Sequence, residues 1–136
     1  MSVRNWGVVR DCMRTNVTEV DGTLDVLSAL KIMKQVGATS LIVKRRDEAD
    51  EHGLLLFSDI AKEVIAKDQA PERVNVYEVM AKPVLSVRPD MQIRYCARLF
   101  DNFGISHAPV VENDKVVGIV SYYLLVLHGI EPDLAK

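Results

Sequence analysis

Several kinds of residue are scarce in this chain of 136 residues, and each scarcity excludes a class of protein. Only two cysteines are present, Cys12 and Cys96, and they lie far apart in the sequence, so we expect buried thiols rather than a disulfide framework. The three histidines have no cysteine or acidic partner at the spacing of zinc ligands, so we expect no metal site. The sequence has no glycine-rich phosphate loop and no constellation of catalytic residues. It therefore predicts a protein that is not an enzyme.

A strong excess of one charge and long apolar runs are also missing. The 17 basic residues nearly balance the 19 acidic ones, giving a net charge of −2. No basic cluster could follow a phosphate backbone, so we expect no nucleic acid partner. No apolar run approaches the roughly 20 residues that span a bilayer, and the first residues, MSVRNWGVVRDCM, lack the apolar core of a signal peptide. We therefore expect a cytoplasmic protein that does not enter a membrane.

What the chain does contain is aliphatic sequence, with 49% hydrophobic and only 6% aromatic residues. The order of elements is clearest in the second half. Two β-branched runs of strand length, residues 109–111 and 116–120, are joined by a polar turn. A helical pattern before them ends at Gly104, and another helix begins at Tyr122. With the strand that precedes the first helix, the order is strand, helix, strand, strand, helix.

The same order occurs twice. An offset of 67 places residues 17–43 over residues 84–110 without a gap, and Gly37, which ends the first helix, falls on Gly104. Few residues are identical, but the apolar positions coincide, and those positions determine a fold. A period this long is outside the range of solenoid repeats and fits two copies of one small αβ unit.

These patterns also predict where each element begins and ends. Thr23 is expected to cap the first long helix, with Asp25 in its first turn, and Asp90 to cap the corresponding helix of the second copy. Gly118 lies inside a strand, where a missing side chain marks a bulge or a close approach. The buried stripe of the first long helix is expected to hold Leu27, Leu30, Met33 and Val36, widened by Val26 and Ala29. The remaining predicted strands are residues 17–20, 40–44, 54–57 and 84–87, and the shorter helices are residues 10–14, 60–67, 77–80 and 122–128, the last ended by Gly129.

Four segments of the second half occur together in a fixed order: Met80, the turn Arg88-Pro89-Asp90, the strand His107-Ala108-Pro109-Val110-Val111 and the strand Gly118-Ile119-Val120-Ser121. With the amphipathic helix between them, they closely resemble a CBS domain, the cystathionine β-synthase type. Residues 13–60 resemble a second CBS domain. No single motif is specific, but two copies in tandem and in register make the resemblance strong.

The resemblance implies an α/β (α+β) fold in which two pseudo-symmetric β-α-β-β-α repeats form one tandem CBS-domain pair. We place the first domain at residues 9–67 and the second at residues 76–130. It also implies a stand-alone regulatory module that assembles as a homodimer through its helices and signals to an effector protein that the sequence does not identify. The apolar cluster from Tyr122 to Leu125 is a candidate for part of that dimer interface.

The resemblance further implies a cleft between the repeats that holds an adenosine-type ligand. AMP, ADP, ATP or S-adenosylmethionine are the candidate regulatory ligands, and no cofactor is required. In the family a Gly-x-x-Ser/Thr-x-x-Asp pattern at the start of the last helix holds ribose and phosphate. The ligand-binding residues that the resemblance implies are Thr15, Asn16, Val17, Ser40, Leu41, Ile42, Ser58 and Asp59 for the first site, and Lys82, Val84, His107, Ala108, Pro109 and Ser121 for the second.

Both copies depart from the family pattern. The first keeps the carboxylate, Asp59, but has Leu56 at the hydroxyl position, and the second keeps the hydroxyl, Ser121, but has Leu124 at the carboxylate position. We favour the first site because ribose recognition depends most on the carboxylate. Ser58 is a candidate replacement for the missing hydroxyl.

Each of these polar residues also has a purely structural interpretation. Ser58 or Asp59 can cap the helix that follows, and Ser121 can cap the last helix. Arg45 or Arg46 could reach a phosphate, but their loop, RRDEADEH, is more simply a solvated hairpin connection. The alternative function is therefore a ligand-independent dimerisation or protein-interaction module with degenerate nucleotide sites.

Overall fold

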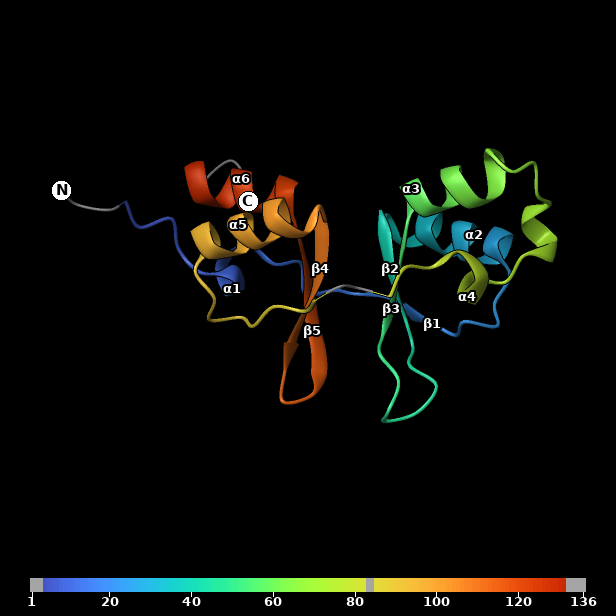
Figure 1. Cartoon of the computed structure of the whole chain (residues 1–136), viewed down its shortest axis with the longest axis horizontal. Coiled ribbons are helices and arrows are strands. Elements are labelled where there is room, and N and C mark those ends of the chain that lie inside the picture. Colours follow the sequence, from blue (N-terminus) through green and yellow to red (C-terminus); the bar gives the residue numbers. More distant parts are fainter. Residues whose placement is uncertain (1–3, 83–84, 132–136) are drawn as a thin grey trace. The chain divides into compact units, whose positions relative to one another are not determined.

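Helices and strands alternate along the chain in the computed structural model, which describes residues 4–82 and 85–131 (Figure 1). This mixture confirms the predicted fold class. The elements of the first repeat are α1 (Val9–Cys12), β1 (Glu19–Val20), α2 (Val26–Val36), β2 (Ser40–Val43), β3 (Gly53–Leu56), α3 (Phe57–Ile60), the π-helix η1 (Ala61–Ile65) and the 3-10 helix η2 (Pro71–Arg73). Those of the second repeat are α4 (Val76–Val79), α5 (Ile93–Phe103), β4 (His107–Glu112), β5 (Lys115–Ser121) and α6 (Tyr122–Ile130). Within the described residues, every helix is too short or too polar to cross a bilayer.

The chain folds into two compact units that do not coincide with the two sequence repeats. The central unit comprises residues 18–82, and the terminal unit comprises residues 4–17 and 85–131. The short helix that begins each repeat belongs to the unit of the other repeat, because α1 packs against α6 and α4 packs against β3. Each unit therefore combines the sheet and long helices of one repeat with the leading helix of the other.

The central unit contains a three-stranded sheet in the order β1, β2, β3. β1 runs parallel to β2, and β2 runs antiparallel to β3, with Ser40 opposite Leu56 and Val43 opposite Gly53. The helices of this unit lie on one side of the sheet (Figure 1). Leu41 and Leu55 are fully buried in the aliphatic core between sheet and helices. β1 is two residues shorter than the sequence predicted. β2 ends one residue earlier than predicted, and β3 both begins and ends one residue earlier.

The first long helix, α2, is capped by Asp25, so the prediction that Thr23 caps it was wrong. The Asp25 carboxylate accepts hydrogen bonds from the Ser28 backbone N–H at 2.9 Å and from the Ser28 hydroxyl at 2.6 Å. These hydrogen bonds lower the pKa of Asp25 below its usual value. Thr23 lies within a turn that is closed by the Leu24 N–H on the Asp21 carbonyl at 3.1 Å, so helical backbone begins only after that turn.

The buried face of α2 is also rotated from the predicted one. Val26, Ala29 and Met33 are fully covered, whereas Leu30 and Val36 are 37% and 51% exposed. Apolar residues lie on both faces at helical spacing, so the sequence pattern alone fits either phase. In the structure the side chains that pack in the core of the unit are the small ones of Val26 and Ala29, together with Met33.

The terminal unit is built on the hairpin of β4 and β5, and its predicted turn is confirmed. Asn113 and Asp114 have φ angles of 53° and 62°, as a two-residue type I′ turn requires. A register shift follows Val110: Val110 pairs with Gly118 and Val111 with Val116, so the ladder has a bulge at Val117. Helices α5 and α6 lie on one side of this hairpin (Figure 1), and Phe100 is fully buried between them and the strands.

The strand predicted at residues 84–87 is not formed as a strand. Val84 lies outside the described residues, and Val87 makes only a single parallel bridge to Val110. Its N–H donates to the Pro109 carbonyl at 3.0 Å, and its carbonyl accepts from the Val111 N–H at 2.9 Å. The chain then enters a turn, and Pro89 has no N–H to extend the ladder.

Two helix ends also differ from the sequence prediction. Gln92, not Asp90, is the residue before α5, because Asp90 lies in a turn closed by the Met91 N–H on the Arg88 carbonyl at 3.1 Å. Gly129 does not end α6, which continues to Ile130. Gly129 is buried inside the helix, where a Cβ atom would lie at ordinary van der Waals distance from Ile93 and Trp6.

The two cysteines lie in one core, although 84 positions separate them in the sequence. Cys12 of α1 and Cys96 of α5 are both buried in the terminal unit, and both are free thiols, as predicted. Burial raises the pKa of Cys12 to about 12, with a further contribution from the neighbouring Cys96. Burial likewise raises the pKa of Cys96 to about 11.

In each unit the last strand of the hairpin touches the segment that follows the leading helix. In the terminal unit Ile119 forms a bridge with Arg14, and in the central unit Leu54 forms one with Ala81. A glycine precedes each hairpin residue. A Cβ atom at Gly118 would lie 2.8 Å from the Arg14 carbonyl oxygen, which confirms the predicted close approach at this position.

Both thiols should be unreactive in the folded protein. Because the thiolate is the reactive form and both pKa values lie well above 8, we expect neither cysteine to react with Ellman's reagent at pH 8 in native buffer. In guanidinium both cysteines should react within minutes. Fast reaction of one thiol in the native protein would show that α1 does not cover the core as described.

Gly118→Ala should destabilise the terminal unit by about 2 kcal/mol, the usual cost of forcing a methyl group into a filled site. The nearest atom is a backbone carbonyl oxygen, which cannot rotate away. Gly53→Ala is the matched control in the central unit. There the nearest atom belongs to the flexible Met80 side chain, so we expect a smaller loss. Urea denaturation followed by circular dichroism measures both, and an equal or larger loss for Gly53→Ala would contradict this account.

Candidate functional site

The carboxylate expected to hold a ribose, Asp59, lies at the start of α3. It is the third residue of that helix, and its Oδ2 atom accepts the backbone N–H of Leu56 at 2.9 Å. Leu56 is the residue before the helix, so the prediction that Ser58 or Asp59 occupies the cap position was wrong. Asp59 still satisfies an amide at the helix start, but it does so by reaching back from within the first turn.

The hydroxyl of the second copy, Ser121, is the cap residue of α6. Its Oγ atom accepts the backbone N–H of Leu124 at 3.3 Å, which confirms the predicted capping role. Leu124, at the position of the missing carboxylate, packs against the core of the terminal unit. Both polar residues that survive from the family pattern therefore make a capping hydrogen bond.

The structure divides the predicted site residues between the two units. The central unit contains Ser40, Leu41, Ile42, Ser58, Asp59 and Lys82. The terminal unit contains Thr15, Asn16, Val17, His107, Ala108, Pro109 and Ser121. Val84 lies outside the described residues. The sequence predicted that each binding site contains residues of both units. That arrangement stays a prediction.

Within each unit, strand pairing brings some predicted residues together. Ser40 lies opposite Leu56, three residues before Asp59, and His107 lies opposite Ser121. The side chain of Leu41 is fully buried in the core, so this residue can offer a ligand only its backbone groups. In both copies, the first residue of one hairpin strand therefore lies opposite the last residue of the other strand, which directly precedes a helix.

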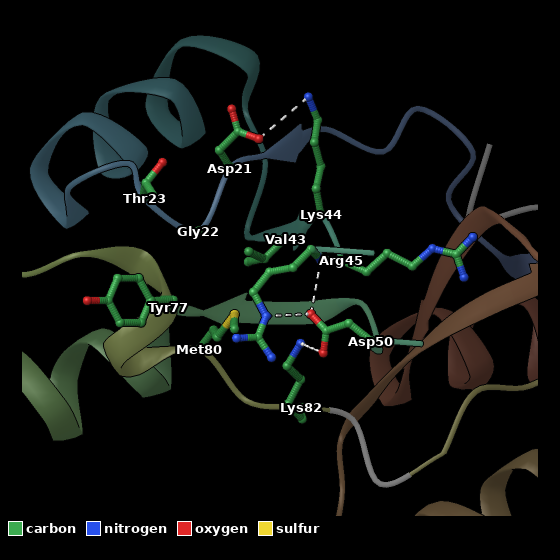
Figure 2. Close-up of a pocket in the computed structure, with 11 residues that line it drawn as sticks. Asp21, Gly22, Thr23, Val43, Lys44, Arg45, Asp50, Tyr77, Met80 and Lys82 are labelled. Atoms are coloured by element: carbon green, nitrogen blue, oxygen red, sulfur yellow. Dashed lines mark hydrogen bonds and ion pairs between the residues drawn. The ribbon is translucent and has the colours of Figure 1, made fainter. Parts of the chain in front are cut away.

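A pocket of about 450 Å³ lies elsewhere in the central unit (Figure 2). The turn of Asp21, Gly22 and Thr23 forms one part of its lining, and the end of β2 with the loop after it forms another. Tyr77 and Met80 complete the apolar side. Of these residues, the sequence indicates a binding role only for the loop arginines, as possible phosphate ligands, and for Lys82, at a different site.

Ion pairs organise the polar side of the pocket. The Asp50 side chain is only 13% exposed and lies 3.2 Å from the Arg46 Nε atom and 3.1 Å from the Lys82 Nζ atom. The Arg46 backbone N–H also donates to Asp50 at 3.0 Å. This backbone hydrogen bond and the neighbouring Lys82 ammonium hold the pKa of Asp50 well below its usual range. Figure 2 shows Asp50 beside Lys82, and Lys44 with Asp21 on the opposite side of the pocket. The Lys44 Nζ atom lies 4.0 Å from an Asp21 carboxylate oxygen.

The sequence could not reveal this cluster. The loop that contains Arg46 and Asp50 was interpreted as a solvated connection between strands, which its composition favours. Lys82 is 32 residues away from Asp50, and only the bridge between Ala81 and Leu54 brings it to the loop. The one available signal was the pair of adjacent arginines at the end of a predicted strand.

The pocket and Asp59 lie at opposite ends of the β2–β3 hairpin. The pocket adjoins Val43, which pairs with Gly53, whereas Asp59 follows Leu56, which pairs with Ser40. Ser40 and Val43 are three residues apart along β2, which corresponds to about 10 Å of extended strand. Across residues 4–82 and 85–131, no three acidic, cysteine or histidine side chains converge as metal ligands would.

Known proteins share both the sequence pattern and the fold. A homoserine O-acetyltransferase of Methanosalsum zhilinae is 36% identical over 113 residues, which are 82% of this chain but only 22% of that protein. The CBS domain-containing protein YhcV of Bacillus subtilis is 30% identical over 83% of this chain and 79% of its own length. The chain thus spans about a fifth of the first relative and most of the second.

Solved structures give the same result. A hexameric CBS-CP12 protein from bloom-forming cyanobacteria superposes with a TM-score of 0.86 at 33% identity, covering 95% of this chain and 75% of that one. The CBS domain pair of protein MJ0100, solved in complex with 5′-methylthioadenosine and S-adenosylmethionine, superposes with a TM-score of 0.73 at 24% identity, over 88% of this chain and 92% of that one. The CBS domain family model matches residues 9–66 and 76–127. The chain therefore belongs to the CBS domain family and is a tandem CBS pair, a regulatory module.

Proposed function

We propose that this CBS pair binds an adenosyl ligand and transmits the binding to a partner protein. The observation that carries the proposal is the position of Asp59, a carboxylate in the first turn of the helix that directly follows β3. The family pattern places its ribose-binding carboxylate there. A carboxylate has about four acceptor sites, so a hydrogen bond from the Leu56 amide is compatible with hydrogen bonds from ribose hydroxyls.

The relatives support the class of ligand and the regulatory role. The MJ0100 pair was solved with two adenosyl compounds, so S-adenosylmethionine and 5′-methylthioadenosine join AMP, ADP and ATP as the ligands to test. The Methanosalsum relative carries its matching region within a protein named as an enzyme. By analogy, we propose that the effector of this pair is an enzyme, either separate or on the same polypeptide. The ligand would act by favouring one of two shapes of the pair, to the extent that it binds them differently.

Exposed apolar residues on the helices support self-association. On α6, Tyr123, Val126 and Ile130 are 66%, 52% and 54% exposed, and Phe103 at the end of α5 is 51% exposed. Several large apolar side chains exposed on one helix are more typical of an interface than of a solvated surface. We propose that these helices form a homodimer. The cyanobacterial neighbour is named as a hexamer, which shows that CBS proteins can form larger assemblies.

A ligand-independent interaction module is the second candidate. Leu56 and Leu124 replace a hydroxyl and a carboxylate of the family pattern, so neither copy has the full polar set. The two remaining polar residues, Asp59 and Ser121, both make capping hydrogen bonds. On this reading the polar residues are kept for helix stability alone, and the pair would capture its partner equally well with and without a nucleotide.

Calorimetry with AMP, ADP, ATP, NAD and S-adenosylmethionine distinguishes the two functions. We expect at least one of these ligands to bind, and Asp59→Ala to weaken its binding about tenfold or more, since a charged hydrogen bond contributes roughly 1–3 kcal/mol. Ser121→Ala is the matched control, because it also removes a capping hydrogen bond and should affect binding less. Circular dichroism verifies that both variants are folded. No heat from any ligand at millimolar concentration supports the second candidate, and a larger effect of Ser121→Ala would reverse the ranking of the two sites.

A further inference from the structure

The lining of the central-unit pocket carries an excess of positive charge. Four of its side chains are cationic and two are carboxylates, although the chain as a whole has a net charge of −2. The cations are Lys44, Arg45, Arg46 and Lys82, and the carboxylates are Asp21 and Asp50. The remaining acidic residues of the adjoining loop, Asp47, Glu48 and Glu51, are not part of the lining. A concave surface with this balance attracts anions.

Two of these cations are held in place while keeping donors available. Arg46 bonds Asp50 through its Nε atom, and its two terminal guanidinium nitrogens make no hydrogen bond to the described part of the chain. Lys82 bonds the same carboxylate and the Glu51 carbonyl, and an ammonium group has three donors. One largely buried carboxylate is shared by two cations, so this cluster carries a net positive charge. An oxyanion such as phosphate, which guanidinium groups bind in a bidentate manner, matches that charge.

The opposite wall of the pocket is apolar. Val43 is fully buried at its base, the Met80 side chain lies beside it, and the Tyr77 ring is 53% exposed (Figure 2). Gly22 packs closely against this wall, since a Cβ atom there would lie only 3.1 Å from the Tyr77 Cβ atom. The volume of about 450 Å³ is within the range of small-molecule sites. A ligand with both an anionic group and an organic part would contact both walls.

We propose that this pocket binds the phosphate group of a small organic metabolite, at a site separate from the one that holds the adenosyl ligand. The two sites lie at opposite ends of the β2–β3 hairpin, about 10 Å apart along the strands. The pocket lining includes none of the residues predicted for the site of Asp59. Lys82, which the sequence assigned to the second adenosyl site, lies in the pocket beside Asp50. The proposal does not depend on the proposed function, because it rests on the charge and shape of the central unit alone.

The competing explanation is that the ion pairs only stabilise the hairpin loop. Exposed ion pairs contribute little to stability, and the Arg46 side chain is 86% exposed. On that explanation, replacing Arg46 would change the melting temperature slightly and would have no connection with anions. The two explanations therefore differ in whether binding of an anion depends on Arg46.

Titration of the ¹⁵N-labelled full chain with inorganic pyrophosphate tests the proposal. We expect saturable amide shifts at Gly22, Lys44, Arg46 and Asp50, which weaken as sodium chloride is added. Arg46→Gln should raise the dissociation constant at least fivefold. Lys34→Gln, which removes an exposed cation of α2 in the same unit, is the matched control and should leave the dissociation constant within twofold. A melting curve of each variant establishes that it is folded.

Three results would overturn the proposal: no shifts at the pocket, equal weakening by Arg46→Gln and Lys34→Gln, or shifts confined to residues around Ser40 and Asp59. Adenosine, which has no phosphate, is titrated in parallel. Binding of adenosine without binding of pyrophosphate at the pocket rejects this site and leaves the proposed function standing. Binding of pyrophosphate at the pocket without any response to adenosyl compounds supports this site and counts against the proposed function.

Discussion

The fold depends on the contact between the last hairpin strand of each unit and the segment that follows the leading helix. In the terminal unit Ile119 and Arg14 exchange backbone hydrogen bonds of 3.0 and 2.9 Å, and in the central unit Leu54 and Ala81 exchange bonds of 2.8 and 2.9 Å. A glycine lies beside each contact, where a Cβ atom would meet the Arg14 carbonyl oxygen at Gly118 and the Met80 side chain at Gly53. These bridges bring a helix from one repeat into the unit of the other, so neither repeat has a complete core of its own.

The same contact has consequences for binding. Lys82 directly follows Ala81, so the bridge that holds the leading helix of the second repeat also brings an ammonium group to Asp50. The exchange of leading helices between the repeats therefore also brings Lys82 into the charged pocket. The equivalent position in the terminal unit is Thr15, which is exposed and uncharged, so the two units are alike in backbone and different in the chemistry that they offer a ligand.

The polar residues of the family pattern illustrate how one side chain can serve both structure and function. Asp59 and Ser121 each accept a backbone N–H that the helix start would otherwise leave unpaired. Capping alone is sufficient reason for the chain to keep them, so their presence does not establish a ligand site. Their locations do follow from the hairpin register, because Ser121 lies opposite His107 and Asp59 follows Leu56, which lies opposite Ser40.

The sequence by itself determined the family, the order of elements, the two strands and turn within residues 109–120 and the glycine ends of both long helices. These features depend on local residue types and their spacing. It could not determine which face of α2 is buried, since apolar residues at helical spacing fit two phases and only packing selects one. It missed Asp25 and Gln92 as the residues before their helices, because the turns that precede both helices use the residues that look like caps. Tertiary structure alone decided which repeat completes which core and that Asp50 meets Lys82, because both result from backbone pairing between segments distant in the sequence.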